Sequence, residues 1–187
     1  MKYSKILLPL IVLFVLNGCL SGSSSYYVLS IASQPEKIYP SSKMLIGVEK
    51  VTVPDYLNKR DIVIAESKSK IKLLNNAHWG EDLDEGLTSR LISFLQKKFN
   101  QPNVYAYPWG VDNTPTLKVK VDIRRFIAQD KYVYLDASFR VVNMKTHFQK
   151  AKLFHTAVPT QKDANSIVSS MDTAFTKLEE AIVKELK

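Results

Sequence analysis

Apolar and polar residues alternate with a period of two through residues 116–124 and 133–141, which predicts two strands with one buried and one solvated face. Phe126 breaks this alternation, so we expect a β-bulge near residues 124–125. Residues 148–158 continue as a third, weaker strand. Together the three segments predict an antiparallel meander with one face in solvent.

The solvated face of this meander is expected to carry cations interleaved with aromatic side chains. Its expected members are Lys118, Lys120, Arg124, Arg140, Lys150, Lys152, Tyr132, Tyr134 and Phe154. Such residues are ordinary on a wet sheet face, which is the favoured interpretation, and a protein or lipid-headgroup contact is the alternative. Nucleic acid, which the same residue types can bind, is not an expected partner of an exported protein.

Two further segments have the spacing of amphipathic helices. The first follows Asp82, with apolar positions at Leu83, Leu87, Leu91, Phe94, Leu95 and Phe99. The second follows Asp163, with apolar positions at Ile167, Met171, Phe175, Leu178, Ile182 and Leu186. Asp82 and Glu85 have the spacing of an acidic capping box, and Asp163 is the expected cap of the second helix.

The first third of the folded domain is rich in β-forming residues. It predicts strands at residues 26–32 and 44–53, the second ended by Pro54, and a hairpin of residues 62–65 and 70–74. With the meander and the helices, this order predicts an α+β fold. We expect two amphipathic helices packed on one face of a mainly antiparallel sheet.

The N-terminus has the features of a secretory signal: a positive start, an apolar run and small residues before Cys19. The apolar run is shorter than the roughly 20 residues that a bilayer-spanning helix needs. Residues 16–19 (LNGC) resemble the bacterial lipobox, in which the cysteine becomes the first residue and carries lipid such as palmitate. Because Cys19 is the only cysteine in the chain, lipidation explains it better than a disulfide does.

These features divide the chain into three parts. Residues 1–18 form the expected signal peptide, and residues 19–25 form the lipidated cysteine with a flexible Ser/Gly tether. Residues 26–187 form a single α+β domain of ordinary size. The formal charge of +8 fits anionic headgroups or acidic partners, and equally a solvated basic surface.

No pattern in the sequence indicates catalysis. His78, His147 and His155 lack the spacing of metal ligands on a helix, and no cysteine cluster accompanies them. The chain has no Gly-x-Ser-x-Gly motif, and its six glycines form no phosphate-binding loop. We therefore expect no catalytic residue, no metal and no cofactor, and do not expect an enzyme.

Three segments resemble a known family. They are residues 26–29 (YYVL), residues 46–63 (IGVEKVTVPDYLNKRDIV) and residues 78–83 (HWGEDL). In this order they resemble the ABC-type transport auxiliary lipoproteins, the PqiC-like family. Asn58 stands where the family pattern commonly has Asp.

The resemblance implies a non-catalytic outer-membrane lipoprotein that faces the periplasm. Such lipoproteins are expected to dock the far end of a tube built by MCE-type subunits, as ring-like homo-oligomers, in lipid trafficking and envelope integrity. The implied partners are an MCE-domain transport subunit, the membrane through the lipid anchor, and further copies of the chain. Leu20 after the cysteine, in place of Asp, also favours the outer membrane.

Residues 54–60 supply the candidate contact site of this docking role. Tyr56, Leu57, Lys59 and Arg60 lie on the loop between two predicted strands, and Tyr and Arg are enriched at binding hot spots. The alternative is that the aromatic ring packs under a strand crossover. We expect Trp79 to be buried beside the helix start.

Two other functions compete with docking. A regulator of a cell-wall synthase also fits a small lipoprotein, but the short tether is a poor match for a reach across peptidoglycan. A periplasmic lipid carrier or lipid-modifying enzyme would need an enclosed apolar cavity of several hundred Å³ or a polar catalytic cluster.

Overall fold

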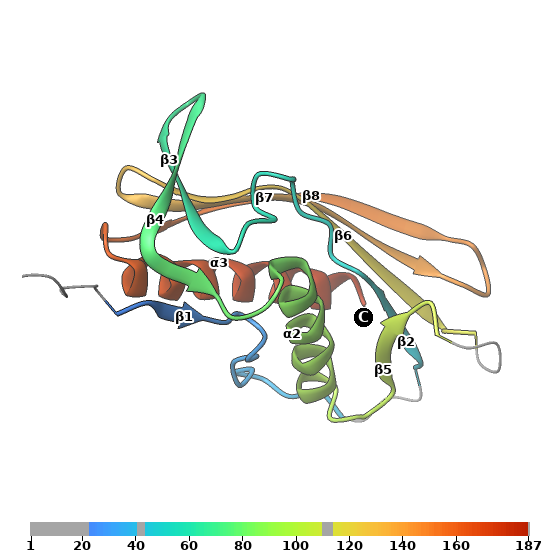
Figure 1. The fold of residues 1–187 in the computed structure, drawn as a ribbon. Coiled ribbons are helices and arrows are strands. Elements are labelled where there is room, and N and C mark those ends of the chain that lie inside the picture. Colours follow the sequence, from blue (N-terminus) through green and yellow to red (C-terminus); the bar gives the residue numbers. More distant parts are fainter. Residues whose placement is uncertain (1–22, 41–43, 110–113, 187) are drawn as a thin grey trace, which may run out of the picture.

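A computed structural model describes residues 23–40, 44–109 and 114–186. The predicted signal peptide and Cys19 lie outside the described residues. The described chain forms one eight-stranded sheet with two helices against it (Figure 1). The elements are β1 (Ser25–Tyr27), β2 (Ile46–Glu49), β3 (Asp61–Ser67), β4 (Lys70–Trp79), α2 (Leu83–Lys98), β5 (Val104–Tyr107), β6 (Leu117–Gln129), β7 (Tyr132–Asn143), β8 (Gln149–Pro159) and α3 (Ala164–Glu185).

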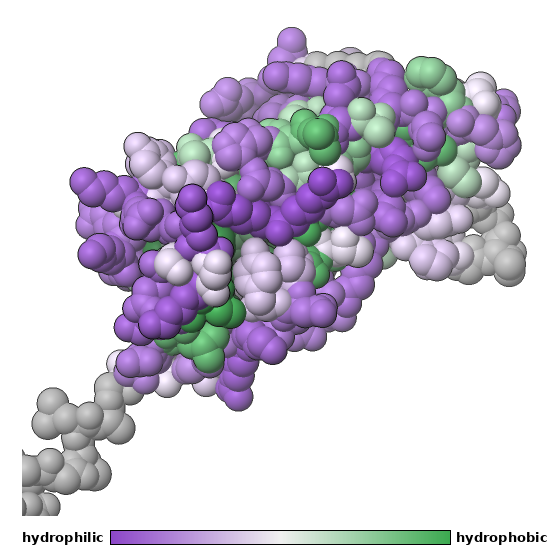
Figure 2. Space-filling model, turned by 90° about the horizontal axis from the view of Figure 1, so that it is seen from above, coloured by the Kyte–Doolittle hydropathy of each residue, from purple (hydrophilic) through white to green (hydrophobic). Residues whose placement is uncertain are grey.

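The meander of β6, β7 and β8 is antiparallel, as the alternation predicts. The expected bulge is confirmed, because the register shifts between Ile123 and Arg125. The buried face of the meander packs against α3, where Phe126 meets Phe175 with ring centroids 6.3 Å apart. Seen from the side away from the helices, the surface is mainly hydrophilic with small, separate apolar patches (Figure 2).

The prediction of a mainly antiparallel sheet is wrong, because the sheet is mixed. β1 pairs with β4, β2 with both β5 and β6, and β3 with β6, and all four of these pairings are parallel. β7 pairs with one edge of β6. Along the other edge, β2 pairs with the start of β6 and β3 with its end, and a bridge from Thr52 to Asp122 lies between them. Strand direction depends on distant crossovers, which a period-two pattern does not encode.

β8 presents the opposite face from the one predicted. Lys150, Lys152 and Phe154 pair with buried residues of β7 and so lie on the helix side of the sheet. There both lysines approach Glu185 of α3, at 3.6 and 3.7 Å. These three residues therefore do not belong to the outer face, which carries Lys118, Lys120 and the other predicted members on β6 and β7.

The two helices begin after the predicted aspartates but differ in their caps. Asp163 caps α3 as predicted, because its Oδ1 accepts a hydrogen bond from the Ser166 N–H at 2.9 Å. Asp82 precedes α2 but makes no side-chain cap hydrogen bond, so the predicted capping box is wrong. Asp84 Oδ1 instead accepts from the Glu85 N–H at 2.8 Å.

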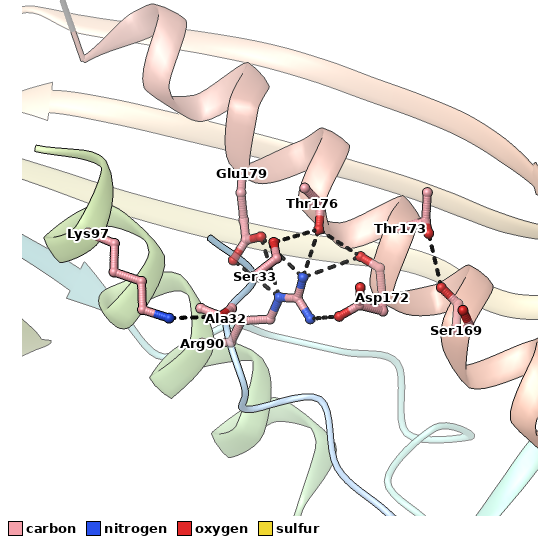
Figure 3. Close-up of polar contacts among 9 residues, drawn as sticks. All are labelled: Ala32, Ser33, Arg90, Lys97, Ser169, Asp172, Thr173, Thr176 and Glu179. Atoms are coloured by element: carbon pink, nitrogen blue, oxygen red, sulfur yellow. Dashed lines mark hydrogen bonds and ion pairs between the residues drawn. The ribbon is translucent and has the colours of Figure 1, made fainter. Parts of the chain in front are cut away.

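A buried ionic cluster fixes α2 against α3 (Figure 3). Arg90 of α2 and Glu179 of α3 are both 0 % exposed, with Arg90 Nε donating to Glu179 Oε1 at 3.2 Å. Arg90 also donates to Asp172 and to Thr176 Oγ1. Burial raises the pKa of the Glu179 carboxyl to about 8, although Arg90 opposes this rise. The cluster sets the position of α2, and with it the site at the start of that helix.

Candidate functional site

The start of α2 and the loop between β2 and β3 meet at one cleft, which we call the helix-start cleft. It has a volume of about 600 Å³ and is lined by Tyr26, Lys50, Asn58, Lys59, Arg60, Trp79, Gly80, Glu81, Asp82, Leu83 and Asp84. Residues from all three segments of the family resemblance therefore line the same cleft.

Backbone hydrogen bonds hold the walls of the helix-start cleft together. The Trp79 N–H donates to the Arg60 carbonyl at 2.7 Å, and the Gly80 N–H donates to the Tyr27 carbonyl at 2.8 Å. A Cβ at Gly80 would lie 3.2 Å from the Val28 side chain, which favours glycine at this close approach. Trp79 is buried, as predicted. The geometry of the cleft thus follows from the backbone of three segments.

Arg60 and Tyr26 contact each other in one wall of the helix-start cleft. Arg60 Nη2 donates to the Tyr26 hydroxyl at 3.1 Å, and its guanidinium lies 5.7 Å from the centre of that ring. The Tyr26 ring also lies 5.4 Å, centre to centre, from the ring of His78, whose Nδ1 is 2.5 Å from Asp61 Oδ1. Arg60 is therefore pre-positioned at the cleft, which lowers the entropy cost of a further contact.

The cleft contains both signs of charge, and some of its charges have no partner. Lys50 contacts Asp84 at 2.9 Å, and this hydrogen bond raises the pKa of the Lys50 ammonium. Within the residues that the structure describes, the side chains of Lys59 and Asp82 make no hydrogen bond or ion pair. Glu81 Oε1 is also buried without a hydrogen-bond partner there, beside Gly86. A cation and an acid therefore remain available to a binding partner.

The four predicted loop residues do not share one surface. Lys59 and Arg60 are exposed at the helix-start cleft, but Leu57 is only 3 % exposed and packs in the core. Tyr56 is partly buried near Arg125 on the outer face of β6, and burial raises the pKa of its hydroxyl. Leu57 therefore does not reach the helix-start cleft and Tyr56 lines a different cleft, while Lys59 and Arg60 stay accessible.

The sequence does not mark the other lining residues as members of one site. The pattern places Lys50 in a strand and Asp82 at a helix cap, and it does not show that both line one cleft. Tyr26 and residues 79–82 fall within the family segments, which were a usable signal.

The described residues offer no feature of a metal site or a membrane-spanning helix. In the three described ranges, no group of three or more His, Cys, Asp and Glu side chains is placed to hold a metal ion. None of the helices placed by the structure is both long and apolar enough to cross a bilayer.

Residues 27–183 match the family described as the ABC-type transport auxiliary lipoprotein component. The chain belongs to this family. The match includes β2, the loop after it and the start of α2, so every lining residue of the helix-start cleft except Tyr26 lies within it.

Curated members of the family give a more detailed likeness over part of the chain. The intermembrane transport lipoprotein PqiC of Escherichia coli (strain K12) is 34 % identical over 98 residues, which are 51 % of this chain and 52 % of that protein. PqiC of Shigella flexneri matches to the same extent. The chain thus spans about half the length of the curated relatives it matches.

Solved structures support the fold of this auxiliary lipoprotein. An uncharacterised protein of known crystal structure is 23 % identical, with a TM-score of 0.70 over 89 % of this chain and 100 % of its own. A protein from Xanthomonas campestris is 14 % identical, with a TM-score of 0.71 over 86 % of this chain and 93 % of its own. At these identities the likeness shows the fold alone.

Proposed function

We propose that this protein is a non-catalytic auxiliary component of an ABC-type lipid transport system. It is anchored in the outer membrane through lipidated Cys19, faces the periplasm and docks an MCE-domain transport subunit as a homo-oligomer. Membership of the transport auxiliary lipoprotein family supports this proposal, as does the likeness to PqiC, an intermembrane transport lipoprotein. The docking supports envelope integrity by keeping the transport path connected.

The helix-start cleft is the observation that carries the docking role. Segments that lie far apart in the sequence meet there, and Lys59 and Asp82 have no partner among the described residues. Charged groups at an interface favour the correct partner because a wrong charge opposite them costs several kcal/mol. A cleft with both signs of charge is therefore suited to recognising a particular protein surface.

Co-purification from intact envelopes tests this proposal. Lysis in mild detergent, capture of the lipoprotein and mass spectrometry identify bound proteins, and the N-terminal peptide reports whether Cys19 is acylated. We expect an MCE-domain subunit in the capture. Recovery of a cell-wall synthase in its place would support the rival regulatory function.

A charge reversal in the cleft locates the contact. Lys59→Glu should lower recovery of the MCE-domain subunit on the order of tenfold, because each 1.4 kcal/mol of lost binding is tenfold in affinity. Lys145→Glu is the matched control, since Lys145 is exposed in the turn between β7 and β8, outside the cleft. Equal loss with both variants would remove the assignment of the cleft.

The carrier alternative needs an enclosed apolar cavity. Clefts of about 600, 620 and 700 Å³ occur among the described residues, but all three are open to solvent and have charged side chains in their lining. This arrangement favours docking over enclosure of a lipid.

A further inference from the structure

The β3–β4 hairpin projects from the body of the sheet on the side away from the helices (Figure 1). Ile71 and Leu73 on β4 are 45 % and 43 % exposed, and they share one face of the hairpin because they pair with Ala65 and Val63. Lys68, beside the tip, is also exposed. The hairpin thus presents two neighbouring apolar side chains and a cation to solvent.

A cleft lies between this hairpin and the outer face of β6, and we call it the hairpin cleft. It has a volume of about 700 Å³ and is lined by Tyr56, Ala65, Ser67, Lys68, Ser69, Lys70, Ile71, Arg124, Arg125, Ile127 and Gln129. Its apolar part comes from Tyr56, Ala65, Ile71 and Ile127. Every charged residue in this lining is a cation.

Two of these four cations are already engaged. Lys70 contacts Glu66 at 2.6 Å, and Arg125 donates to Gln129 at 2.6 Å and lies 3.9 Å from the centre of the Tyr134 ring. By contrast, Lys68 and Arg124 make no hydrogen bond or ion pair with any described residue. The hairpin cleft thus combines an apolar floor with two uncompensated positive charges.

The bulge in β6 explains the exposed position of Arg124. The register passes from Ile123 paired with Ala137 to Arg125 paired with Asp136, so Arg124 has no partner on β7. A bulge re-aims side chains and often marks a functional edge of a sheet. Here it adds a second cation to the outer face beside the hairpin.

The position of the chain's N-terminal end indicates which anionic surface is nearby. β1 lies at the same end of the molecule as the β3–β4 hairpin and the turn between β6 and β7, but on the helix side (Figure 1). Its first residue, Ser25, pairs with Ala77, seven residues along β4 from Lys70 at the hairpin tip. Cys19 precedes Ser25 by six residues, which span at most about 20 Å when extended. With Cys19 acylated, the hairpin end of the domain is thus held close to a bilayer surface.

We propose that the hairpin cleft binds anionic phospholipid headgroups of the bilayer that holds the anchor. This inference rests on the anchoring through Cys19 that forms part of the proposed function. Lys68 and Arg124 pair with headgroup phosphates, while Ile71 and Leu73 enter the interfacial region. The hairpin is a second membrane contact, which sets the orientation of the domain and leaves the helix-start cleft to its protein partner.

Fluorescence of a labelled hairpin tests this orientation. The acylated, full-length lipoprotein carrying Ser69→Cys is labelled with an environment-sensitive fluorophore and reconstituted into vesicles. Acylation blocks Cys19, the only native cysteine, so position 69 is the one reactive thiol. The vesicles contain phosphatidylcholine alone or with phosphatidylglycerol. A label at Thr146→Cys, in the exposed turn between β7 and β8, is the control.

We expect a blue shift and quenching by a lipid-borne quencher at position 69 in vesicles that contain phosphatidylglycerol, reversed by high salt, and no change at position 146. Lys68→Gln with Arg124→Gln should lower the ratio of inserted to free label about 25-fold, since each basic residue near an anionic surface contributes about fivefold. Lys145→Gln should leave this ratio unchanged.

Three results would overturn the proposal: no difference between the two vesicle compositions, no effect of the double variant, or a shift that needs an added transport subunit. The last result would assign the cleft to an acidic protein segment. Mass spectrometry of the N-terminal peptide separates these outcomes from a failure of anchoring, in which Cys19 is unmodified and the proposed function itself fails.

Discussion

The two helices both follow an aspartate, but the two aspartates do different things. Asp163 accepts a hydrogen bond from the backbone of α3, while Asp82 leaves the start of α2 without a side-chain cap. The first turn of α3 is therefore stabilised by its own cap, whereas the Asp82 carboxylate at the start of α2 remains available in the helix-start cleft. Binding sites often give up local stability for available polar groups, and this difference supports the proposed contact site at the start of α2.

The largest expected effect comes from the cluster that holds α2 in place. Arg90→Ala leaves the buried Glu179 carboxyl without its hydrogen-bond donor, and breaking such a buried pair costs about 3–5 kcal/mol in the free energy of unfolding. Lys177→Ala, at an exposed position on α3, should change it by less than about 0.5 kcal/mol. Denaturant unfolding of both variants measures the difference. Similar values would show that the cluster does not position α2.

The same cluster predicts a dependence of stability on pH. Because the pKa of Glu179 is raised from 4.5 to about 8, the folded chain holds a proton that the unfolded chain releases between these values. Its contribution to stability is therefore full below about pH 4.5 and is lost as pH rises through about 8, with a slope of at most about 1.4 kcal/mol per pH unit.

Glu179→Gln removes the titrating group and should flatten this slope. Glu180→Gln, at a partly exposed neighbour, should keep most of it, because the charge of Glu180 is the smallest cause of the raised pKa of Glu179. Unfolding midpoints measured from pH 5 to 8 on the wild type and both variants provide the comparison. A wild type that becomes more stable across this window would contradict the assignment.

Removing the aspartate before each helix should have the next largest effect on stability. Asp163→Ala removes the hydrogen bond to Ser166 and should lower the melting temperature by about 2–4 °C, as expected for the loss of a cap in a chain of this size. Asp82→Ala removes no cap bond and should lower it by less, while weakening recovery of the transport partner. Equal losses of melting temperature would erase the distinction between the two helix starts.

The hydrogen bond at Asp163 also has a pH signature of opposite sign. It lowers the pKa of Asp163, so its stabilisation is present above the unfolded pKa and is lost as pH falls through the folded one. Asp163→Asn should keep most of the cap without this acid dependence, because Asn is also a good cap. Thermal melts at neutral and acidic pH distinguish the two side chains.

Local features of the fold were predictable from the sequence, and non-local ones were not. The stripe of α3 and its cap at Asp163, the β3–β4 hairpin and the bulge beside Arg124 depend on neighbouring residues, and all are present. β5 was missed because four residues give too short a pattern. The side of the sheet on which Lys150 lies depends on how β8 is aligned with β7, and the weak alternation in β8 does not specify this alignment.

The candidate site was predictable only in part for the same reason. Lys59 and Arg60 stood out by type and by family likeness, and both reach a cleft. Leu57 lies on the same loop, yet it packs in the core, since burial depends on which elements cover the loop. The partner of Arg90 is 89 residues away, so its burial had no local signal.

Photo-crosslinking in living cells tests the central claim most directly. A photoreactive amino acid replaces Lys59 at the helix-start cleft or Lys145 in the distant turn, and the adducts are identified by mass spectrometry. We predict an adduct with an MCE-domain subunit at position 59 and none at position 145. A cell-wall synthase at position 59, or no adduct there while position 145 captures the transport subunit, would contradict the account.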